Sequence, residues 1–430
     1  MTQIPEDVNA QLASKLKATL PSHIFDLLTS AAVQAENQGW QIYLVAGILR
    51  DSLLGLDVRD LDISVVGNAL QIVEELARSS GFELEVFGQF GTATLKRPGE
   101  PDIDLVTARK ESYPQPGALP IVEAGDIYDD LARRDFSVNA MAVQFTPGGF
   151  GMLLDPHDGI ADLRARSIRL LHNQSFRDDP TRIFRAVKFA RRLGFSIEKQ
   201  TLELILQAVR DGALYTVSMD RITREIMLIL EEPRADAMLW DLDRFGVLTS
   251  IHPLLSWPYE PGKIRSYQDE LLTPEERRDT YLAVLGAELG PEPDEADNVA
   301  HWLSLPAPQA KLMRDAARLG KLWPQLSEEQ SRWRIYNLLR ELDVRALEAY
   351  ARIEALRSDK TAWERLVLFL DTLRHIKPEI GGDYLESLGA RPGPIYGEVL
   401  EQLLEAKVEG NVPTRADEEK FVREKLTQGE

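Results

Sequence analysis

LVAGILRDSLLGLDVRDLDISVVG, residues 44–67, is the stretch that decides the fold. It continues an apolar, β-branched run, residues 41–47, that ends in a glycine, which is typical of a strand that turns into a helix. Residues 59–67 alternate between polar and apolar side chains and end at another glycine, so we expect a second strand there. Asp60 and Asp62 are two positions apart on that strand, and their side chains therefore leave the same face.

These paired carboxylates predict a cation site. Asp60 and Asp62 repel each other unless a cation lies between them, and Mg²⁺ prefers oxygen ligands and is often shared with substrate phosphates. Asp104, on a later expected strand, is placed to add a third carboxylate, an arrangement used for two-metal phosphoryl transfer. Gly47 begins a turn whose N–H groups, together with Arg50, are suited to triphosphate oxygens. The alternative is an edge strand with solvated aspartates beside an ordinary turn.

The pattern on either side of this stretch predicts an α+β head followed by helices. Residues 5–38 have apolar positions near a 3.6-residue period and predict a helix, and residues 68–80 predict an amphipathic helix. Further strands are expected where glycine or proline bounds short runs: 82–87, 90–97 and 101–109. The strands together predict a sheet of five or a similar number. After about residue 145 helical patterns dominate, so we expect an all-α neck, body and tail.

Composition excludes several classes of protein. The 430 residues include no cysteine, which excludes disulfides, thiolate nucleophiles and zinc ribbons. No run approaches a membrane span and the start shows no secretory signal, so we expect a cytoplasmic protein without a membrane partner. The net charge is −19. However, residues 131–234 carry 16 Lys and Arg against 13 Asp and Glu, whereas the segments before and after them are acidic. Positive charge for a nucleic-acid partner is therefore concentrated there and on a helix-face patch: Lys311, Arg314, Arg318 and Lys321.

The decisive stretch contains G-x-x-R-D-x-L-L-G-x-x-x-x-D-x-D, and this resembles the first motif of class II tRNA nucleotidyltransferases. That family comprises the CCA-adding enzymes and related bacterial poly(A) polymerases. The matching positions are Gly47, Arg50, Asp51, Leu53, Leu54, Gly55, Asp60 and Asp62. Ala46 departs from the family, which usually has a second glycine there. The resemblance implies a polymerase β-like nucleotidyltransferase head with Asp60, Asp62 and Asp104 as catalytic residues, and Mg²⁺ held by Asp60 and Asp62.

DLARRDFSVNAMA, residues 130–142, resembles the family's RRDFTINALA segment. The resemblance assigns Arg134, Asp135 and Asn139 to the ribose and triphosphate end of a nucleotide. The chemistry agrees, because an aspartate accepts from ribose hydroxyls while arginine and asparagine donate to phosphate. The alternative is a salt-bridge cluster on the surface.

RDDPTRIFRAVKFARRLGF, residues 177–195, resembles the family's base-reading motif, E/D-D-x-x-R. Asp179 and Arg182 are three residues apart and are expected to share a helix face, with Arg185 one turn further along and suited to phosphate. Cytosine and adenine both present an amino donor beside a ring-nitrogen acceptor, and an aspartate with an arginine complements that pattern. The alternative is an ordinary capped helix with an ion pair, and both interpretations are compatible.

Two later segments extend the resemblance over nearly the whole chain. VSMDRITREIMLIL, residues 217–230, resembles a family helix and assigns Arg221 and Glu225 to support of the base-reading helix. Residues 388–422 resemble the closing segment of one bacterial branch. The implied domains are a catalytic head, a neck with the base-reading helix, the start of a helical body with linkers, and a tRNA-binding body and tail: 1–145, 146–235, 236–300 and 301–430.

The resemblance implies template-independent, Mg²⁺-dependent addition of CCA to the 3′ end of tRNA, with CTP and ATP as donors. CC addition alone, A addition alone and poly(A) synthesis share these motifs. Family knowledge places the difference in a flexible stretch, here residues 108–130, whose full length disfavours a CC-only enzyme. A non-catalytic RNA-binding protein and a small-molecule nucleotidyltransferase are alternatives of other classes. The sequence leaves the oligomeric state open.

Overall fold

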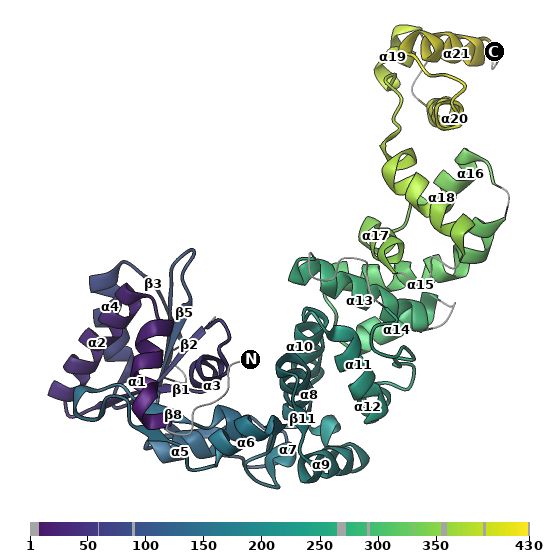
Figure 1. Ribbon diagram of the computed structural model, residues 1–430. Helices are drawn as coiled ribbons and strands as arrows, with labels where there is room; N and C mark the ends of the chain where they lie inside the picture. Colours follow the sequence, from purple (N-terminus) through teal and green to yellow (C-terminus); the bar gives the residue numbers. More distant parts are fainter. Residues whose placement is uncertain are drawn as a thin grey trace. The chain divides into compact units, whose positions relative to one another are not determined.

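The chain forms two compact units, Met1–Ile222 and Thr223–Glu430 (Figure 1). The computed structural model describes residues 8–58, 60–87, 91–264, 272–289, 293–328, 330–353, 359–389 and 393–428. The finer domain limits at residues 145, 235 and 300 stay predictions. The mixed sheet and the helices that follow it confirm the predicted fold class.

The first unit is built on a seven-stranded sheet in the order β3-β4-β5-β2-β1-β8-β9. Its strands are β1 Gln41–Val45, β2 Asp60–Val66, β3 Glu83–Phe87, β4 Thr92–Lys96, β5 Asp102–Thr107, β8 Ala142–Gln144 and β9 Leu153–Leu154. β2 and β5 run parallel, and the other neighbouring strands run antiparallel. The sheet has more strands than the expected five because two short strands, β8 and β9, extend it beyond β1.

Helices α1 Val8–Thr19, α2 Ser22–Asn37, α3 Gly47–Leu54 and α4 Ala69–Ser80 accompany the sheet. The helical pattern of residues 5–38 is confirmed for the described residues, where it forms two helices; residues 5–7 lie outside the described part. Pro21 is the N-cap of α2, and its ring and missing N–H prevent α1 from continuing. α4 packs against β4 and β5 and also contacts α2, so the apolar faces of these elements form the head's core.

Residues 108–130 form an ordered connection. β6 Arg109–Ser112 and β7 Ile121–Ala124 pair as an antiparallel hairpin, and α5 Ile127–Ala132 follows with a capping box at Asp126. The rest of the unit is mostly helical, with α6 Gly159–Ala165, α7 Ser175–Asp178, α8 Arg182–Leu193, α9 Lys199–Arg210 and the short helix η4 Ala213–Thr216. A small parallel pair, β10 Ser167–Ile168 and β11 Ser196–Ile197, links the start of this region to the end of α8.

The second unit consists, in its described residues, of helices joined by loops. After α10 Met219–Leu230, which spans the boundary between the units, come α11 Ala235–Arg244, α12 Val247–Ile251, α13 Pro274–Glu288, α14 Pro293–Trp302, α15 Ala307–Ser327, α16 Arg332–Leu339, α17 Val344–Arg352, α18 Lys360–Asp371, α19 Gly382–Ser387, α20 Pro394–Glu409 and α21 Arg415–Gln428.

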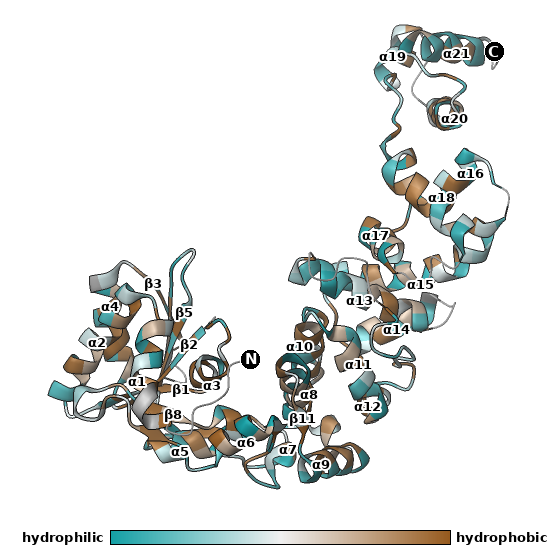
Figure 2. Cartoon of the chain, viewed as in Figure 1, coloured by the Kyte–Doolittle hydropathy of each residue, from teal (hydrophilic) through white to brown (hydrophobic). Residues whose placement is uncertain are grey.

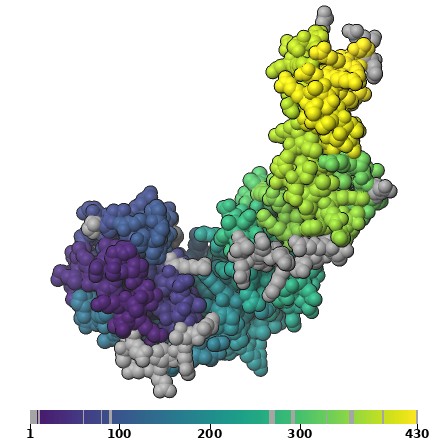
Figure 3. Space-filling view, turned by 45° about the horizontal axis from the view of Figure 1, so that its top comes forward, coloured from purple at the N-terminus to yellow at the C-terminus, as the bar shows by residue number. Residues whose placement is uncertain are grey.

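The last three helices have a small core of their own, which includes Leu385, Leu403 and Val422. In Figure 3 their yellow side chains pack together, and in Figure 2 α21 is mostly teal because its outer face is charged. In the part of the chain that the structure describes, no helix is both long and apolar enough to cross a membrane.

Candidate active site

The site begins with carboxylates on the parallel strands β2 and β5. In the register of this pair Asp60 lies opposite Asp102 and Asp62 lies opposite Asp104. Alternate residues such as Leu61 are buried on the other face of the sheet. Because parallel partners in register project from the same face, the predicted carboxylates are neighbours across two strands.

Electrostatics indicate that this cluster is short of positive charge. Burial raises the pKa of Asp62; the cations of Arg134 and Arg50 oppose the rise, and the carboxylates of Asp104 and Asp60 add to it. A divalent cation would relieve this repulsion, and carboxylate oxygens are the donors that Mg²⁺ prefers. The donor chemistry therefore fits the implied metal.

The side chains do not form a complete coordination shell by themselves. Within the described residues no group of three or more His, Asp or Glu side chains is gathered closely enough to hold a metal ion. Asp104 instead accepts a hydrogen bond of 2.5 Å from the Thr94 hydroxyl on β4. A Mg²⁺ ion bound by Asp60 and Asp62 would need water and phosphate oxygens to complete its coordination.

Helix α3 begins next to the carboxylates. A Cβ atom on Gly47, its first residue, would lie 3.6 Å from Arg50 Nη2 and 3.9 Å from Asp62 Oδ2. Ala46, the N-cap, has φ 58° and ψ −120°, a conformation that a glycine adopts without strain. This explains why the family usually has glycine there, and it shows that the methyl group of Ala46 strains the turn.

A chain of hydrogen bonds joins four of the predicted residues. The Arg50 guanidinium donates to both carboxylate oxygens of Asp51, at 2.8 and 2.9 Å, and Nη1 donates to Asn139 Oδ1 at 2.6 Å. Asn139 Nδ2 donates to Asp135 Oδ1 at 3.0 Å, and Arg185 Nε donates to Asp135 Oδ2 at 2.7 Å. The sequence motifs that supply Arg50, Asp135 and Arg185 therefore meet in one network.

Asp135 is the anionic centre of that network. It is buried, and burial alone would raise its pKa, but the Arg185 cation, the Asn139 amide and the Arg182 cation together lower the pKa to about 2. Asp135 is therefore ionised at every physiological pH. Both of its carboxylate oxygens accept hydrogen bonds from protein donors.

Asp130 is a site residue that the motif analysis missed. Its buried carboxylate accepts from Arg133 Nη2 at 2.7 Å and from Arg134 Nη2 at 2.8 Å. Burial raises the pKa of Asp130, but Arg134 and Arg133 outweigh it and lower the pKa below the ordinary value. Asp130 begins the segment that contains RRDF. The feature of the sequence that could have identified Asp130 is its spacing to the two arginines, which is that of neighbours on one face of a helix. Arg134 Nε is buried with no hydrogen-bond partner among the described residues, so it has a donor to offer an anion.

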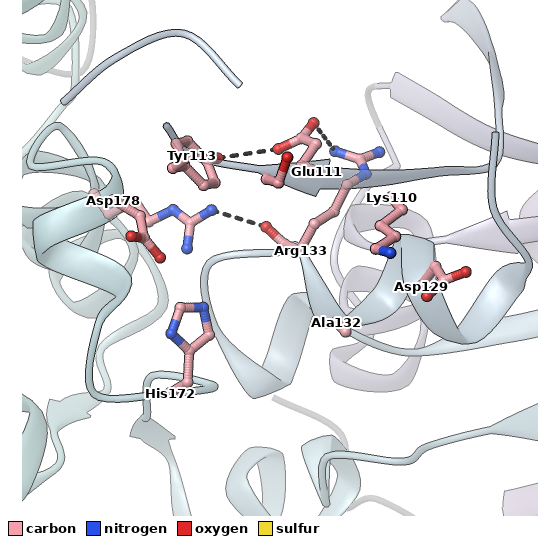
Figure 4. Close-up of a pocket in the computed structure, with 10 residues that line it drawn as sticks. Lys110, Glu111, Tyr113, Asp129, Ala132, Arg133, His172 and Asp178 are labelled. Carbon is pink, nitrogen blue, oxygen red and sulfur yellow. Dashed lines mark hydrogen bonds and ion pairs between the residues drawn. The ribbon is translucent and has the colours of Figure 1, made fainter. Parts of the chain in front are cut away.

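A pocket of about 310 Å³ opens between the hairpin strand β6, α5 and the start of α8 (Figure 4). The residues that line it are Lys110, Glu111, Ser112, Tyr113, Asp129, Ala132, Arg133, His172, Asp178 and Arg182.

Acidic, basic and neutral polar side chains line this pocket. Figure 4 shows His172 and Asp178 at the left of the view, Tyr113 above Asp178, and Glu111 and Arg133 further to the right. Tyr113 donates to Glu111 Oε2 at 3.0 Å, and burial chiefly raises the pKa of Tyr113 to about 12. Burial, assisted by a nearby arginine, lowers the pKa of His172, so this imidazole is neutral at neutral pH. The pocket thus offers neutral donors and acceptors beside a carboxylate and guanidinium groups.

The expected pairing of Asp179 with Arg182 on one helix face was wrong. Asp179 has extended backbone angles, φ −139° and ψ 93°, and α8 begins only at Arg182. Asp179 Oδ1 accepts from the N–H and the hydroxyl of Thr181, at 3.1 and 2.6 Å, and from Arg221 Nη2 at 2.9 Å. Its carboxylate thus caps the turn before α8 and receives support from α10.

Arg182, by contrast, reaches the pocket and is 6% exposed. Its Nη1 donates to Ser175 Oγ at 2.5 Å, and its Nη2 donates to the carbonyl oxygen of Arg133 at 2.8 Å. Arg221 also donates from Nη1 to the carbonyl of Gly117 at 3.0 Å. Glu225, the other predicted support residue, has a buried Oε2 with no hydrogen-bond partner among the described residues.

Comparison with known proteins places this arrangement in a family. The model of the Poly A polymerase head domain matches residues 42–169, and that of the probable RNA and SrmB-binding site of polymerase A matches residues 194–257. The structure titled Thermotoga maritima CCA-adding enzyme complexed with tRNA-CCA is 29% identical, covers 100% of both chains and has a TM-score of 0.72.

Two curated relatives have the same kind of name. An A-adding tRNA nucleotidyltransferase of Geobacter sulfurreducens is 34% identical over 88% of this chain, which spans only 44% of that relative. An A-adding tRNA nucleotidyltransferase of Halalkalibacterium halodurans is 31% identical over 96% of this chain and 95% of its own length. Because this second match extends over nearly the whole of both proteins, the chain belongs to the tRNA nucleotidyltransferase family.

Proposed function

We propose that this chain adds AMP from ATP to tRNA whose 3′ end is CC. The observation that carries the proposal is the in-register placement of Asp62 and Asp104 on β2 and β5, beside an arginine network and a base-sized pocket. The A-adding names of the two relatives support AMP as the transferred group.

The chain's own residues would orient the substrates and stabilise the charge on the triphosphate during the transfer. Transfer joins the tRNA 3′ oxygen to the α-phosphorus, breaks the bond to the β-phosphate oxygen and releases pyrophosphate and the hydroxyl proton. Arg50, Arg134 and Arg185 would donate to the triphosphate and stabilise its charge as pyrophosphate leaves. Asp60 and Asp62 would hold Mg²⁺, which when bound supplies Lewis-acid polarisation of the phosphate. Asp104, which accepts a hydrogen bond from the Thr94 hydroxyl, would add a third carboxylate near the attacking oxygen.

Addition of the whole CCA end is the second candidate. It is supported by the CCA-adding structure, which matches over the full chain, and by the length of residues 108–130, which form the complete hairpin and α5. The two candidates differ only in whether CTP is also a donor.

The test uses the purified chain, Mg²⁺ and a tRNA prepared with three 3′ ends: the discriminator base, CC and CCA. ATP and CTP are supplied separately and together, and products are resolved at single-nucleotide length. A addition only to the CC-ended tRNA supports the proposal. Incorporation of C onto the discriminator base, followed by A, replaces it with full CCA addition. Failure to extend any of the three contradicts both candidates.

Matched variants separate the chemistry from the fold. Asp62→Asn should abolish incorporation of every nucleotide, because it removes one of the two carboxylates proposed to hold the metal. Asp57→Asn, an exposed aspartate just before β2, should leave the rate unchanged. Equal loss in both variants would show that the effect comes from folding.

A further inference from the structure

Tyr113, the first residue after strand β6, places an aromatic ring in the wall of the pocket (Figure 4). The sequence motifs assign no role to this residue. A pocket of about 310 Å³ has room for a nucleobase, since small-molecule sites measure roughly 300–1,000 Å³. Among the described residues that line it, only Tyr113 and His172 carry rings. The tyrosine therefore gives the pocket a flat aromatic face beside its charged groups.

The ring of Tyr113 is held in place by its hydroxyl group. Tyr113 Oη donates to Glu111 Oε2 at 3.0 Å, and the Glu111 side chain is only 6% exposed. Glu111 Oε1 accepts from Arg109 Nη2 at 2.9 Å and from Arg133 Nη1 at 3.3 Å. Two arginines therefore fix the Glu111 carboxylate, and the carboxylate in turn fixes one end of the tyrosine ring.

Arg133 connects this ring to the arginine that is predicted to read the base. The Arg133 guanidinium binds Glu111, while the Arg133 carbonyl oxygen accepts from Arg182 Nη2 at 2.8 Å. Burial chiefly raises the pKa of Tyr113, and the Arg182 cation and the Asp179 carboxylate are among the charges that act on this hydroxyl. Tyr113 and Arg182 are therefore neighbours that are tied to the same residue.

We propose that Tyr113 stacks on the face of the incoming nucleobase while Arg182 meets the edge of that base. This inference rests on the proposed function and adds a specificity-determining residue to it. Every base has a π face, so an aromatic side chain can stack on any of the four. Adenine has two fused rings and covers more of the tyrosine than cytosine does. Tyr113 therefore favours ATP over CTP by the size of the base, whereas the edge selects by hydrogen-bonding pattern.

The test compares ATP with inorganic tripolyphosphate as ligands of the purified chain, by calorimetry in Mg²⁺ and without tRNA. Tyr113→Leu and Tyr113→Gln both remove the ring from a half-buried position. Either variant should bind ATP about tenfold more weakly, within the range found for the loss of one base–aromatic stack. Binding of CTP should weaken less than binding of ATP, and the affinity for tripolyphosphate should not change.

Tyr113→Phe separates the ring from its hydroxyl. This variant keeps the aromatic face but loses the hydrogen bond to Glu111, so ATP binding should weaken by only about threefold. Tyr128→Leu is the matched control, because Tyr128 on α5 is 55% exposed and is not among the residues that line the pocket. The control should bind ATP and tripolyphosphate as the unmodified protein does.

An unchanged ATP affinity in Tyr113→Leu and Tyr113→Gln would overturn the inference. An equal loss of affinity for ATP and tripolyphosphate would also overturn it, because a ring cannot stack on a ligand that has no base. If Tyr113→Phe loses as much affinity as Tyr113→Leu, the hydroxyl and not the face of the ring is responsible. If the unmodified protein binds ATP in a Tyr113-dependent way but extends no tRNA, the proposed function fails and the stacking role stands.

Discussion

At the scale of single residues, Ala46 is the strained position of the site. Backbone angles of φ 58° and ψ −120° cost a non-glycine residue roughly 1–3 kcal/mol. Ala46→Gly should therefore increase the free energy of unfolding by about 1 kcal/mol, after allowing for the greater freedom of glycine in the unfolded chain. Urea denaturation monitored by circular dichroism measures this change.

The control is Ala77→Gly within α4, where the backbone is helical and no strain is relieved. That variant should lose about 1 kcal/mol. A loss of stability in Ala46→Gly as well would show that the turn tolerates the methyl group without strain.

Base selection is also argued from single residues. Arg182 lines the pocket, whereas Asp179 caps the turn before α8. Arg182→Ala should relax discrimination, so that kcat/KM for UTP and GTP rises relative to ATP, because a wrong base then leaves one fewer buried donor unpaired. Asp178→Ala and Asp179→Ala, compared in the same assay, identify which carboxylate cooperates with it. If Arg182→Ala lowers kcat/KM for all nucleotides by one factor, Arg182 does not select the base.

Spacing could not reveal the partners of these residues. The resemblance assigned Arg182, Asp135 and Arg185 to nucleotide binding, which stays a prediction; the structure places Arg182 at a pocket and Asp135 beside Arg185. Helix periodicity placed Asp179 and Arg182 on one face, whereas Asp179 accepts from Arg221, 42 residues away, which the resemblance had assigned to support of the base-reading helix. Asp130 was missed because a buried acid looks like an ordinary surface residue in the sequence until its arginine partners are placed beside it.

At the scale of elements, the hairpin β6–β7 is anchored at Gly117. Its N–H donates to the carbonyl of Arg177 at 3.1 Å, and its own carbonyl accepts from Arg221. Gly117 has φ +69°, and a Cβ there would lie 2.5 Å from the carbonyl oxygen of Thr216. The hairpin is therefore fastened at its tip to η4 while its strand β6 lines the pocket.

Gly117→Ala should detach this hairpin. The added methyl group collides with backbone, so the tip must move away and take Lys110 and Tyr113 of the pocket with it. We expect faster cleavage of residues 108–130 in limited proteolysis and a KM for ATP raised several-fold. Gly99→Ala has a similar positive φ of +82° but nothing within 4 Å of the added atom, so it should show neither effect. The same behaviour in both variants would refute a specific clamp at Gly117.

The ends of strands and helices could be predicted where the spacing of apolar residues changes sharply along the sequence. The alternation at residues 59–67 predicts β2 Asp60–Val66 almost residue for residue, and the helix expected at 68–80 is α4 Ala69–Ser80. The helical segment expected at residues 5–38 is divided at Pro21. The apolar residues keep the same spacing on both sides of Pro21, so the sequence pattern does not reveal the break. The short strands β8 and β9 are stabilised by pairing with β1 and carry too little pattern to be recognised alone.

At the scale of the whole molecule, positive and negative charges are unevenly distributed along the sequence. Residues 131–234 have a positive balance within a protein of net charge −19. The expected basic patch on α15 is partly neutralised, because Lys311 and Arg318 pair with Asp315 and Arg314 pairs with Asp297. Contacts with tRNA phosphates should therefore come mainly from residues 131–234.

The affinity for tRNA should decrease as salt rises, with a log–log slope of about −0.7 to −0.9 for each phosphate neutralised. Fluorescence titration of end-labelled tRNA between low and physiological salt measures the slope. Charge removal at Arg314, which is paired, should leave the slope unchanged. An affinity that does not vary with salt would contradict the prediction that charged residues bind the tRNA phosphates.

The ends of the seven-stranded sheet bear on how this protein behaves in a crowded solution. An exposed strand edge is a template on which another chain can add a strand and begin to aggregate. One edge here is β3, which carries Glu83 and Glu85, with Glu85 paired to Lys96 at 2.6 Å. The opposite edge, β9, is only two residues long. A charged edge and a very short one both discourage strand addition, so we expect this sheet to resist polymerising into fibrils.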